Sequence, residues 1–292
     1  MNALSRQNLW QLVLINAIWG FNIIAIKLCV DRFPPVFLSL LRFLIVGIAV
    51  WPWLRLRRGE MQWLLTAAIC SGGLQFALMF SGVALSGSMS SVAIASQLGV
   101  PFATLMSVML LGERIHWRRW LGIGLAFAGV LVLGFSQEVL AAPGGLMIIV
   151  LAAFIGAIGL VAVKRVRNLE PLELQAWLAW ASLPFLVPLS FLLEDGQLDS
   201  LKNADLVDWS ALLYSAVLAS LFAHTAYFGL IRRYPVSSVA PVTVLSPLFS
   251  VLFSVLLLGD RLDARMVIGG LMTLSGVVVI VVRERRPAPA AS

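Results

Sequence analysis

One line of sequence occurs twice in this chain, about half its length apart. Ser90–Ile115 reads SSVAIASQLGVPFATLMSVMLLGERI, and Ser237–Leu262 reads SSVAPVTVLSPLFSVLFSVLLLGDRL. When Ser90–Gly134 is aligned with Ser237–Val281 without a gap, roughly 18 of 45 positions are identical, well above what shared apolar composition gives. Such internal similarity predicts two structurally related halves.

Both copies lie in a chain of long apolar stretches. Of the 292 residues, 60% are hydrophobic and 12% are charged, whereas a soluble domain averages roughly 25% charged residues. A soluble chain of this length could not bury so much apolar surface, so the composition indicates a bilayer. Since a membrane-spanning helix needs about 20 mostly apolar residues, the sequence predicts ten spans, at 9–30, 35–54, 62–84, 90–111, 117–136, 144–165, 172–193, 209–231, 236–258 and 264–282.

The repeat also predicts how the halves are oriented. The first copy begins the fourth predicted span and the second copy begins the ninth, so an odd number of spans turns the second copy upside down. The starts of the halves correspond as well, since Lys27 aligns with Lys164. We therefore predict an all-α membrane protein of ten transmembrane helices in two inverted five-helix repeats, at 1–140 and 141–284, with a disordered tail at 285–292.

The basic residues predict the topology. With the N-terminus inside, the inner segments hold about 15 Lys and Arg residues and the outer loops about four, and positively charged loops stay in the cytoplasm. Both termini are therefore expected in the cytoplasm. The long polar connection 194–208 is expected outside, exposed to solvent.

The first span has a polar face. Four of its residues share one side of a 3.6-residue helix, namely Asn16, Trp19, Gly20 and Lys27, whereas Asn22 points elsewhere. Such a stripe suits a cavity wall, with a tight helix contact as the alternative, because polar groups within spans usually face the bundle interior. Gly20 is expected to allow close helix packing. Lys27 is equally suited to an anionic substrate group and to lipid headgroups.

Polar residues and prolines recur inside other spans. They are Gln75 in the third span, Gln97 and Pro101 in the fourth, and Thr243, Ser246 and Pro247 in the ninth. A proline frees a backbone carbonyl, which a cavity or a neighbouring helix can satisfy and lipid cannot. Two prolines at nearly corresponding depths in the two halves point to a site between them. The alternative for each Ser or Thr is a hydrogen bond to its own helix.

Titratable side chains within the spans are few. His224 and Tyr227 share a face of the eighth span. His224 is either a hydrogen-bond partner or a proton carrier, and burial favours the neutral imidazole of a hydrogen-bond partner. Arg42 is interpreted as structural, bonding backbone carbonyls, with attraction of an anionic group such as a carboxylate as the alternative.

Each copy of the repeated line ends in a glycine followed by an acid, Gly112 with Glu113 and Gly259 with Asp260. Glycine suits a left-handed helix end. The acid would then lie near the positive N-terminus of the next helix. We interpret Glu113 and Asp260 as loop clamps at the membrane interface rather than substrate ligands.

The sequence shows no apparatus for catalysis. No Asp or Glu lies in the middle of a predicted span, no HExxH, GxSxG or P-loop motif occurs, and the two cysteines have no Cys or His at ligand spacing. We expect no enzyme and no cofactor or metal site. Basic clusters between apolar stretches suit anionic membrane faces rather than nucleic acid.

Several segments resemble the EamA-type transporters of the drug/metabolite transporter superfamily. They are IWGFNIIAIK (Ile18–Lys27), FPPVFLSLLRF (Phe33–Phe43), RYPVSSVAP (Arg233–Pro241) and the paired LLGER and LLGDR. The resemblance covers nearly the whole chain. The chain resembles in particular bacterial inner-membrane exporters of amino acids and their metabolites, such as cysteine and O-acetylserine. It implies a secondary transporter that exports a small metabolite by alternating access.

We expect a cavity lined by spans 1, 3, 4, 6, 8 and 9. Its expected substrate-binding residues are Asn16, Trp19, Lys27, Gln75, Gln97, His224, Tyr227, Thr243 and Ser246, and the expected structural or gating residues are Gly20, Arg42, Pro101, Glu113, Pro247 and Asp260. A non-transporting membrane enzyme or assembly factor is the alternative, and a channel is disfavoured because no ring of like charges or carbonyl-rich filter is visible. The partners are a small molecule and the bilayer, and a homodimer is left open.

Overall fold

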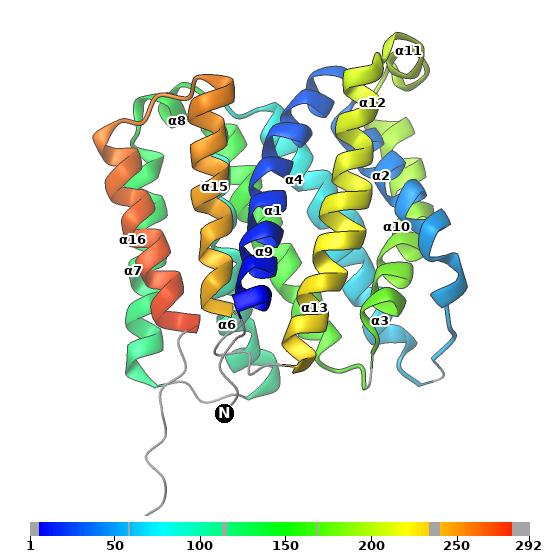
Figure 1. The fold of residues 1–292 in the computed structure, drawn as a ribbon, viewed down its shortest axis with the longest axis horizontal. Coiled ribbons are helices and arrows are strands. Elements are labelled where there is room, and N and C mark those ends of the chain that lie inside the picture. Colours follow the sequence, from blue (N-terminus) through cyan, green and yellow to red (C-terminus); the bar gives the residue numbers. More distant parts are fainter. Residues whose placement is uncertain (1–5, 58, 113–115, 168, 234–239, 282–292) are drawn as a thin grey trace, which may run out of the picture.

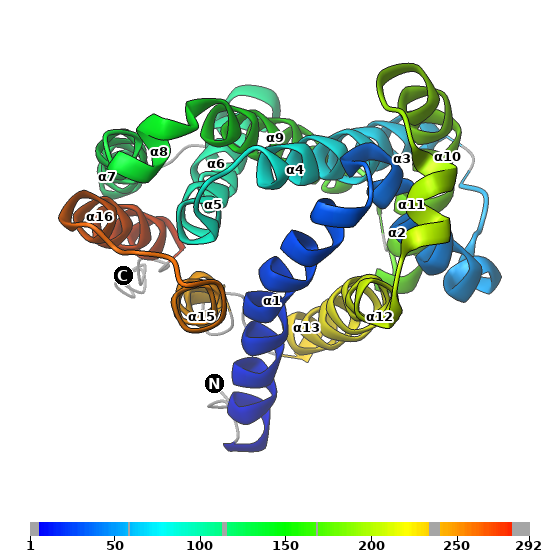
Figure 2. The ribbon, with the colours of Figure 1, turned by 90° about the horizontal axis from the view of Figure 1, so that it is seen from above.

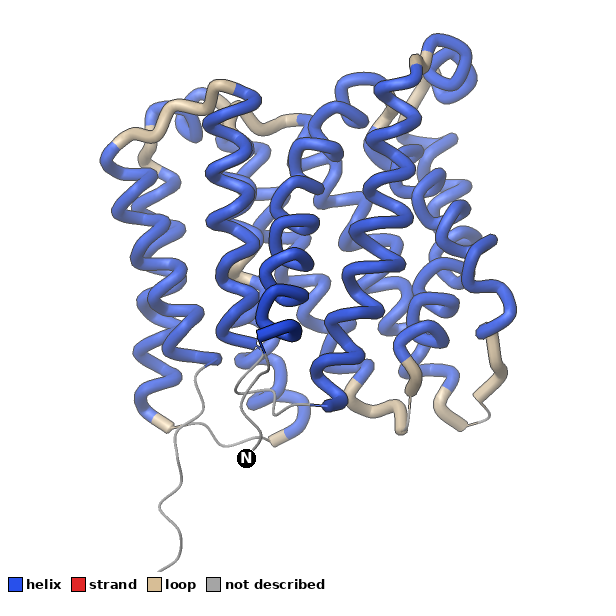
Figure 3. The backbone as a smooth tube through the Cα atoms, in the orientation of Figure 1, coloured by secondary structure: helices blue, strands red, loops and turns tan. Residues whose placement is uncertain are grey.

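The computed structural model describes residues 6–57, 59–112, 116–167, 169–233 and 240–281, and every regular element in this part of the chain is a helix (Figure 3). The elements of the first half are α1 (Arg6–Arg32), α2 (Pro35–Val50), the 3₁₀ turn η1 (Trp51–Trp53), α3 (Met61–Ala67), the π-helical η2 (Ala68–Leu74), α4 (Gln75–Ala84), α5 (Met89–Ser96), α6 (Gly99–Leu111) and α7 (Trp117–Gly134). A short α8 (Gln137–Ala141) leads into the second half.

The second half repeats this order. Its elements are α9 (Pro143–Val163), α10 (Pro171–Leu193), α11 (Gln197–Asn203), α12 (Leu206–Leu213), the π-helical η3 (Tyr214–Ala223), α13 (His224–Arg233), the 3₁₀ segment η4 (Ala240–Val244), α15 (Leu245–Phe253), the π-helical η5 (Ser254–Leu258) and α16 (Ala264–Val281).

These elements form the ten predicted spans. Among the described residues, nine helical segments are long and apolar enough to cross a membrane, and the shorter Val242–Leu258 is the tenth. Large apolar side chains remain exposed along them, such as Ile48, Leu131 and Met147 at 67%, 68% and 71%. Such a surface is stable in lipid and not in water. The prediction of an all-α membrane protein is confirmed, with span ends within three residues of those predicted, except that the start of the ninth span falls outside the described residues.

The two halves exchange equivalent contacts. The fifth spans of the two halves, α7 and α16, pack along each other at one side of the molecule, and the second spans, α2 and α10, do so at the other side (Figure 2). Between them, α1 packs on α15 and η3 of the second half, while α9 packs on α4, η2 and α6 of the first. This reciprocity is the arrangement of an inverted repeat. The first residue of α1 and the last residue of α16 lie at the same end of the bundle (Figure 1).

Glycines set the closest of these contacts. Gly122 and Gly129 of α7 correspond in the repeat alignment to Gly269 and Gly276 of α16. A Cβ atom built on Gly269 would lie 2.5 Å from the Gly129 carbonyl oxygen, and one built on Gly276 would lie 2.5 Å from the Gly122 oxygen. Because no side chain fits there, the crossing of α7 and α16 requires glycine on both helices.

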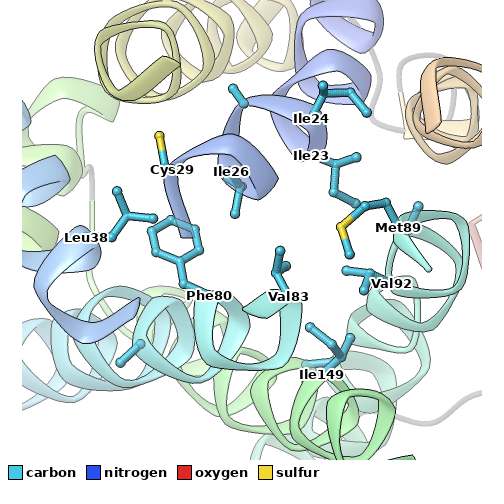
Figure 4. Packing of buried hydrophobic residues seen from close by; sticks show 14 of the residues in the cluster. Ile23, Ile24, Ile26, Cys29, Leu38, Phe80, Val83, Met89, Val92 and Ile149 are labelled. Atoms are coloured by element: carbon cyan, nitrogen blue, oxygen red, sulfur yellow. The ribbon is translucent and has the colours of Figure 1, made fainter. Parts of the chain in front are cut away.

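The buried core lies around α1. Ile23 and Ile26 point from α1 towards Val83 of α4 and Met89 of α5, with Ile149 of α9 behind them (Figure 4). All five side chains are at most 6% exposed. Residues of three helices of the first half and of α9 in the second half therefore share one apolar cluster, which holds the halves together.

Acidic residues of the second half cap helices of the first. The Glu194 carboxylate accepts hydrogen bonds from the backbone N–H groups of Val36 (2.7 Å) and Phe37 (2.9 Å) at the start of α2. Asp260 Oδ2 accepts from the N–H of Ser90 (2.7 Å) and the hydroxyl of Ser88 (3.2 Å) at the start of α5. Each carboxylate thus satisfies orphan donors at a positive helix end.

The expectation that Asp260 lies at the start of the following helix is wrong. That helix, α16, is capped by Asp263, whose Oδ1 accepts from Met266 N–H at 2.7 Å. Gly112 and Gly259 do adopt the left-handed conformation, with φ of 66° and 73°. Asp260 follows Gly259 directly, and η5 and α15 pack against α5, so the carboxylate meets the start of α5. Glu113 lies outside the described residues, as does the tail 285–292.

The connection 194–208 is more ordered than a solvent-exposed loop. It contains α11, and the residues Gln197 and Asp208 are only 7% and 8% exposed. Asp208 accepts from Arg32 Nε at 3.0 Å and takes part in the capping box of α12. The acids of this segment therefore serve as helix caps and ion-pair partners, a role that their charge alone did not reveal.

At the opposite end of the bundle, Arg57 joins the halves. Its Nε and Nη2 atoms donate to the two carboxylate oxygens of Glu173 in α10, at 2.6 and 2.7 Å, and Nη1 donates to the Arg167 carbonyl at 2.6 Å. Hydrogen bonding to Glu173 raises the pKa of Arg57 above its ordinary value. A bidentate pair of this kind fixes the orientation of both chains.

Candidate functional site

The fourth and ninth spans depart from α geometry at the same repeat position, and each such departure is called an interruption below. The fourth span breaks between α5 and α6, at Gln97 and Leu98, and the ninth changes from 3₁₀ to α geometry at Val244 and Leu245. Gln97 and Val244 correspond in the repeat alignment. Interrupted helices at equivalent positions of inverted repeats are typical of transporter binding sites.

The two interruptions face one cavity. It has a volume of about 120 Å³ and is lined by Trp19, Asn22, Ile23, Ile26, Met79, Ala93, Ser96, Gln97, Ser246, Pro247 and Ser250. The lining comes from α1, α4, the α5–α6 break and α15, so both repeats contribute to it. Among these residues none is charged, and the polar groups are hydroxyls, amides and an indole. The cavity is smaller than the roughly 300–1,000 Å³ that drug-sized ligands occupy.

Prolines mark where each interrupted span resumes. Pro101 and Pro247 are both the third residue of their helices, α6 and α15. In the first helical turn no intrahelical acceptor exists for an N–H group, so a proline costs little there. The expectation that Pro101 frees a backbone carbonyl near mid-membrane is not met, because the carbonyl four residues earlier, that of Gln97, accepts from the Val100 N–H at 3.1 Å. Pro247 lines the cavity. Pro101 is buried and does not line it, although Gln97, four residues earlier, does.

An aromatic cluster lies behind the cavity. The Trp19 ring packs against His224 and Tyr227, with centroids 5.0 and 5.2 Å away. The Ala219 carbonyl in η3 accepts from Trp19 Nε1 at 3.2 Å and lies 2.7 Å from His224 Nδ1. Because a carbonyl only accepts, Nδ1 carries a proton in this arrangement. His224 is thus held as a hydrogen-bond donor, and π-helical segments such as η3 often occur at functional sites.

Three predicted binding residues lie away from the cavity. Asn16 is fully buried and its amide donates to Leu12 of its own helix at 2.7 Å. Lys27 forms an ion pair with Asp31 one turn further along α1. Gln75 packs against Gly156 of α9, where even a Cβ atom would not fit.

The remaining predictions divide between the cavity and its supports. Gln97 and Ser246 line the cavity, while Thr243 lies in η4 and is not part of the lining. Gly20 contacts α15, and its carbonyl accepts from Ser250 Oγ at 3.2 Å. Arg42 is buried and its guanidinium binds the Ser220 hydroxyl rather than a backbone carbonyl.

The cavity differs from the expected one in two ways. Of the expected spans, the sixth and eighth do not contribute lining residues, because α9 lies behind α4 and α6, and Trp19 lies between the cavity and His224. Asn22, which was expected to point elsewhere, lines the cavity, and its Oδ1 is buried with no hydrogen-bond partner. An amide side chain within an apolar span is the sequence signal that could have identified it.

The arrangement is suited to binding rather than covalent chemistry. Within the described residues no nucleophile–base pair lines the cavity, and no group of three His, Cys, Asp or Glu side chains is placed to hold a metal ion. Asn22, Gln97 and Ser246 offer hydrogen bonds from both halves of the molecule. A small polar solute can therefore be held at the interface of the repeats.

Comparisons with known proteins agree with this architecture. The chain is 28% identical to a probable amino-acid metabolite efflux pump of Salmonella typhimurium, over 98% of this chain and 99% of that protein. It is 26% identical to a protein of the same description from Escherichia coli, over 94% and 95% of the two chains. A crystal structure with 19% identity shares the fold, with a TM-score of 0.62 over 94% of this chain and 96% of the other.

A family model settles the relationship. The model of the EamA-like transporter family matches twice, at residues 9–135 and 143–282, once in each half. Together the two matches cover most of the chain, and each spans five of the helical segments described above. The repeated sequence, the ten spans and the double match lead to one conclusion: the chain is a membrane transporter that belongs to the EamA-like transporter family.

Proposed function

We propose that this protein is a secondary transporter that exports a small polar metabolite, an amino acid or a derivative of one, by alternating access. The observation that carries the proposal is the pair of interrupted spans, which line one cavity from both repeats. Because the halves are inverted copies, an exchange of their shapes closes one side of the cavity and opens the other. The neutral polar lining and the small volume favour a solute of amino-acid size, and the descriptions of the relatives agree with this class.

Counterflow in proteoliposomes tests this proposal. Vesicles preloaded with one unlabelled amino acid or derivative are diluted into its labelled form, for a panel of small polar and apolar solutes. A carrier gives a transient, saturable accumulation of label, because each inward passage is coupled to an outward one. Protein-free liposomes are the control, and uptake that rises linearly with concentration and shows no overshoot would indicate a channel instead.

We propose an inner-membrane location with both termini in the cytoplasm, supported by the distribution of basic residues. In a Cys29→Ala, Cys70→Ala background, Lys202→Cys is expected to react with an impermeant maleimide added to intact spheroplasts, since Lys202 lies on α11 with its side chain 75% exposed. Arg55→Cys, at the opposite end of the bundle, is expected to react only in inverted vesicles. The reverse labelling pattern would overturn the topology.

A further inference from the structure

Arg42 carries a buried guanidinium for which the described part of the chain supplies no acidic partner. Its side chain lies in α2 and the residue is 4% exposed. Nε and Nη2 donate to the Ser220 hydroxyl at 3.1 and 2.6 Å, while Nη1 is buried with no hydrogen-bond partner. Among the described residues, no carboxylate lies within ion-pair distance of this guanidinium.

This state is costly inside a membrane protein. A buried charge is normally paired and fully hydrogen-bonded, because its removal from water is repaid only by a close counter-charge. Ser220 does not supply one, since its hydroxyl is neutral and itself donates to the Ser215 carbonyl at 2.9 Å. The Phe76 ring, 4.1 Å from the guanidinium carbon, adds only a cation–π contact. The described residues around the guanidinium therefore offer it no counter-charge.

The neighbours of the guanidinium connect it to two elements that support the cavity. On one side it stacks on Phe76 and Phe80 of α4, the helix whose Met79 lines the cavity. On the other side its partner Ser220 follows Ala219, whose carbonyl holds the cavity residue Trp19. The guanidinium is therefore linked to residues of the cavity wall through α4 on one side and through η3 on the other.

We propose that Arg42 binds the carboxylate of the transported solute, an inference that rests on the function proposed above. Arginine presents planar, parallel donors that match a carboxylate. Because Nη1 has no partner, the guanidinium can donate to a carboxylate and keep its hydrogen bonds to Ser220. The role fits the uncharged lining of the cavity, which supplies no other cation. Lys27 does not fill it, because its ammonium is paired with Asp31.

A purely structural role for Arg42 makes a different prediction. The two hydrogen bonds to Ser220 join α2 to η3. If this link is the role of Arg42, Arg42→Gln and Ser220→Ala should impair the protein equally. If Arg42 instead binds the carboxylate of the solute, this binding should be lost in Arg42→Gln and kept in Ser220→Ala. Solute selectivity, rather than activity alone, separates these roles.

The test compares each amino acid with its carboxamide, which has the same shape and no anionic group. Binding is measured as the rise in unfolding temperature of the purified protein, and transport as inhibition of counterflow. In the wild type and in Ser220→Ala we expect the acid to bind about 10- to 100-fold more tightly than the amide, as for a hydrogen bond to a charged group. In Arg42→Gln we expect this preference to disappear while amide binding is kept, and Arg42→Lys to retain part of it.

The outcomes are distinguishable. Equal binding of acid and amide by the wild type, or an unchanged preference in Arg42→Gln, overturns the role of Arg42 while observed counterflow leaves the transport function standing. Carboxylate-selective stabilisation without counterflow supports the Arg42 site and contradicts the transport function. If Arg42→Gln does not fold, the wild-type comparison and Arg42→Lys decide, and absence of both stabilisation and counterflow for every solute rejects both proposals.

Discussion

Replacement of Gly129 by leucine is expected to abolish folding of the protein. Gly129 faces Gly269 and Thr273 across the crossing of α7 and α16, where backbone meets backbone. Overpacking a well-packed contact usually costs about 1–3 kcal/mol, and more when the obstacle is backbone that cannot repack. The helices must separate along their length, so we expect Gly129→Leu to lose the monodisperse peak in size-exclusion chromatography in detergent.

Gly124 provides the matched control on the same helix. It is exposed, and apart from its chain neighbours and the backbone of its own helix, no atom lies within 4 Å of a Cβ built on it. Leucine has the same higher helix propensity at both positions, so any difference reports the contact and not the helix. Gly124→Leu should give wild-type yield and unfolding temperature. If Gly129→Leu behaves in the same way, α7 and α16 do not cross as closely as described.

The repeat in the sequence predicted the arrangement of the helices because it acts over the whole chain. An odd number of spans between the copies at Ser90 and Ser237 requires inversion, whichever residues make the contacts. Span positions followed from length and hydropathy, which lipid imposes on each helix separately. Both signals are independent of tertiary packing, and the structure agrees with both.

The candidate site was predicted less completely, because a helical face has more than one neighbour. Asn16 and Trp19 share a face of α1, yet Asn16 bonds within its helix while Trp19 reaches η3 and the cavity. In the third span, Gln75 contacts α9 and Met79 lines the cavity, although a 3.6-residue period places them on one side. Periodicity gives the direction of a side chain and not the helix that it meets.

Long-range caps were also beyond local patterns. The sequence near Asp260 indicated an acid at a helix N-terminus, which is correct, but not that the helix belongs to the other half. The partner of Glu194 at the start of α2 was equally hidden, since 157 residues separate it from Phe37. Which helix end an acid meets is fixed by the fold, and only the need for a cap is written locally.

Closing the cavity is expected to stop transport without unfolding the protein. Ser246 is the second residue of α15 and lines the cavity next to the helix interruption. The phenyl ring of Ser246→Phe would occupy much of the roughly 120 Å³ available, so a solute could bind only by displacing it. We expect counterflow to fall about tenfold or more, which corresponds to the ~1–3 kcal/mol of overpacking that a bound solute would then face.

Ser210→Phe is the matched control, because Ser210 is an exposed residue of α12 whose hydroxyl bonds only to the Val207 carbonyl of its own helix. At position 210 the same ring points away from the protein and should leave counterflow unchanged. Both variants should keep the wild-type unfolding temperature to within a few degrees, since the ring at 246 enters existing space. Counterflow by Ser246→Phe equal to that of Ser210→Phe would show that the solute does not pass between the interrupted spans, and would remove the observation on which the proposed transport route depends.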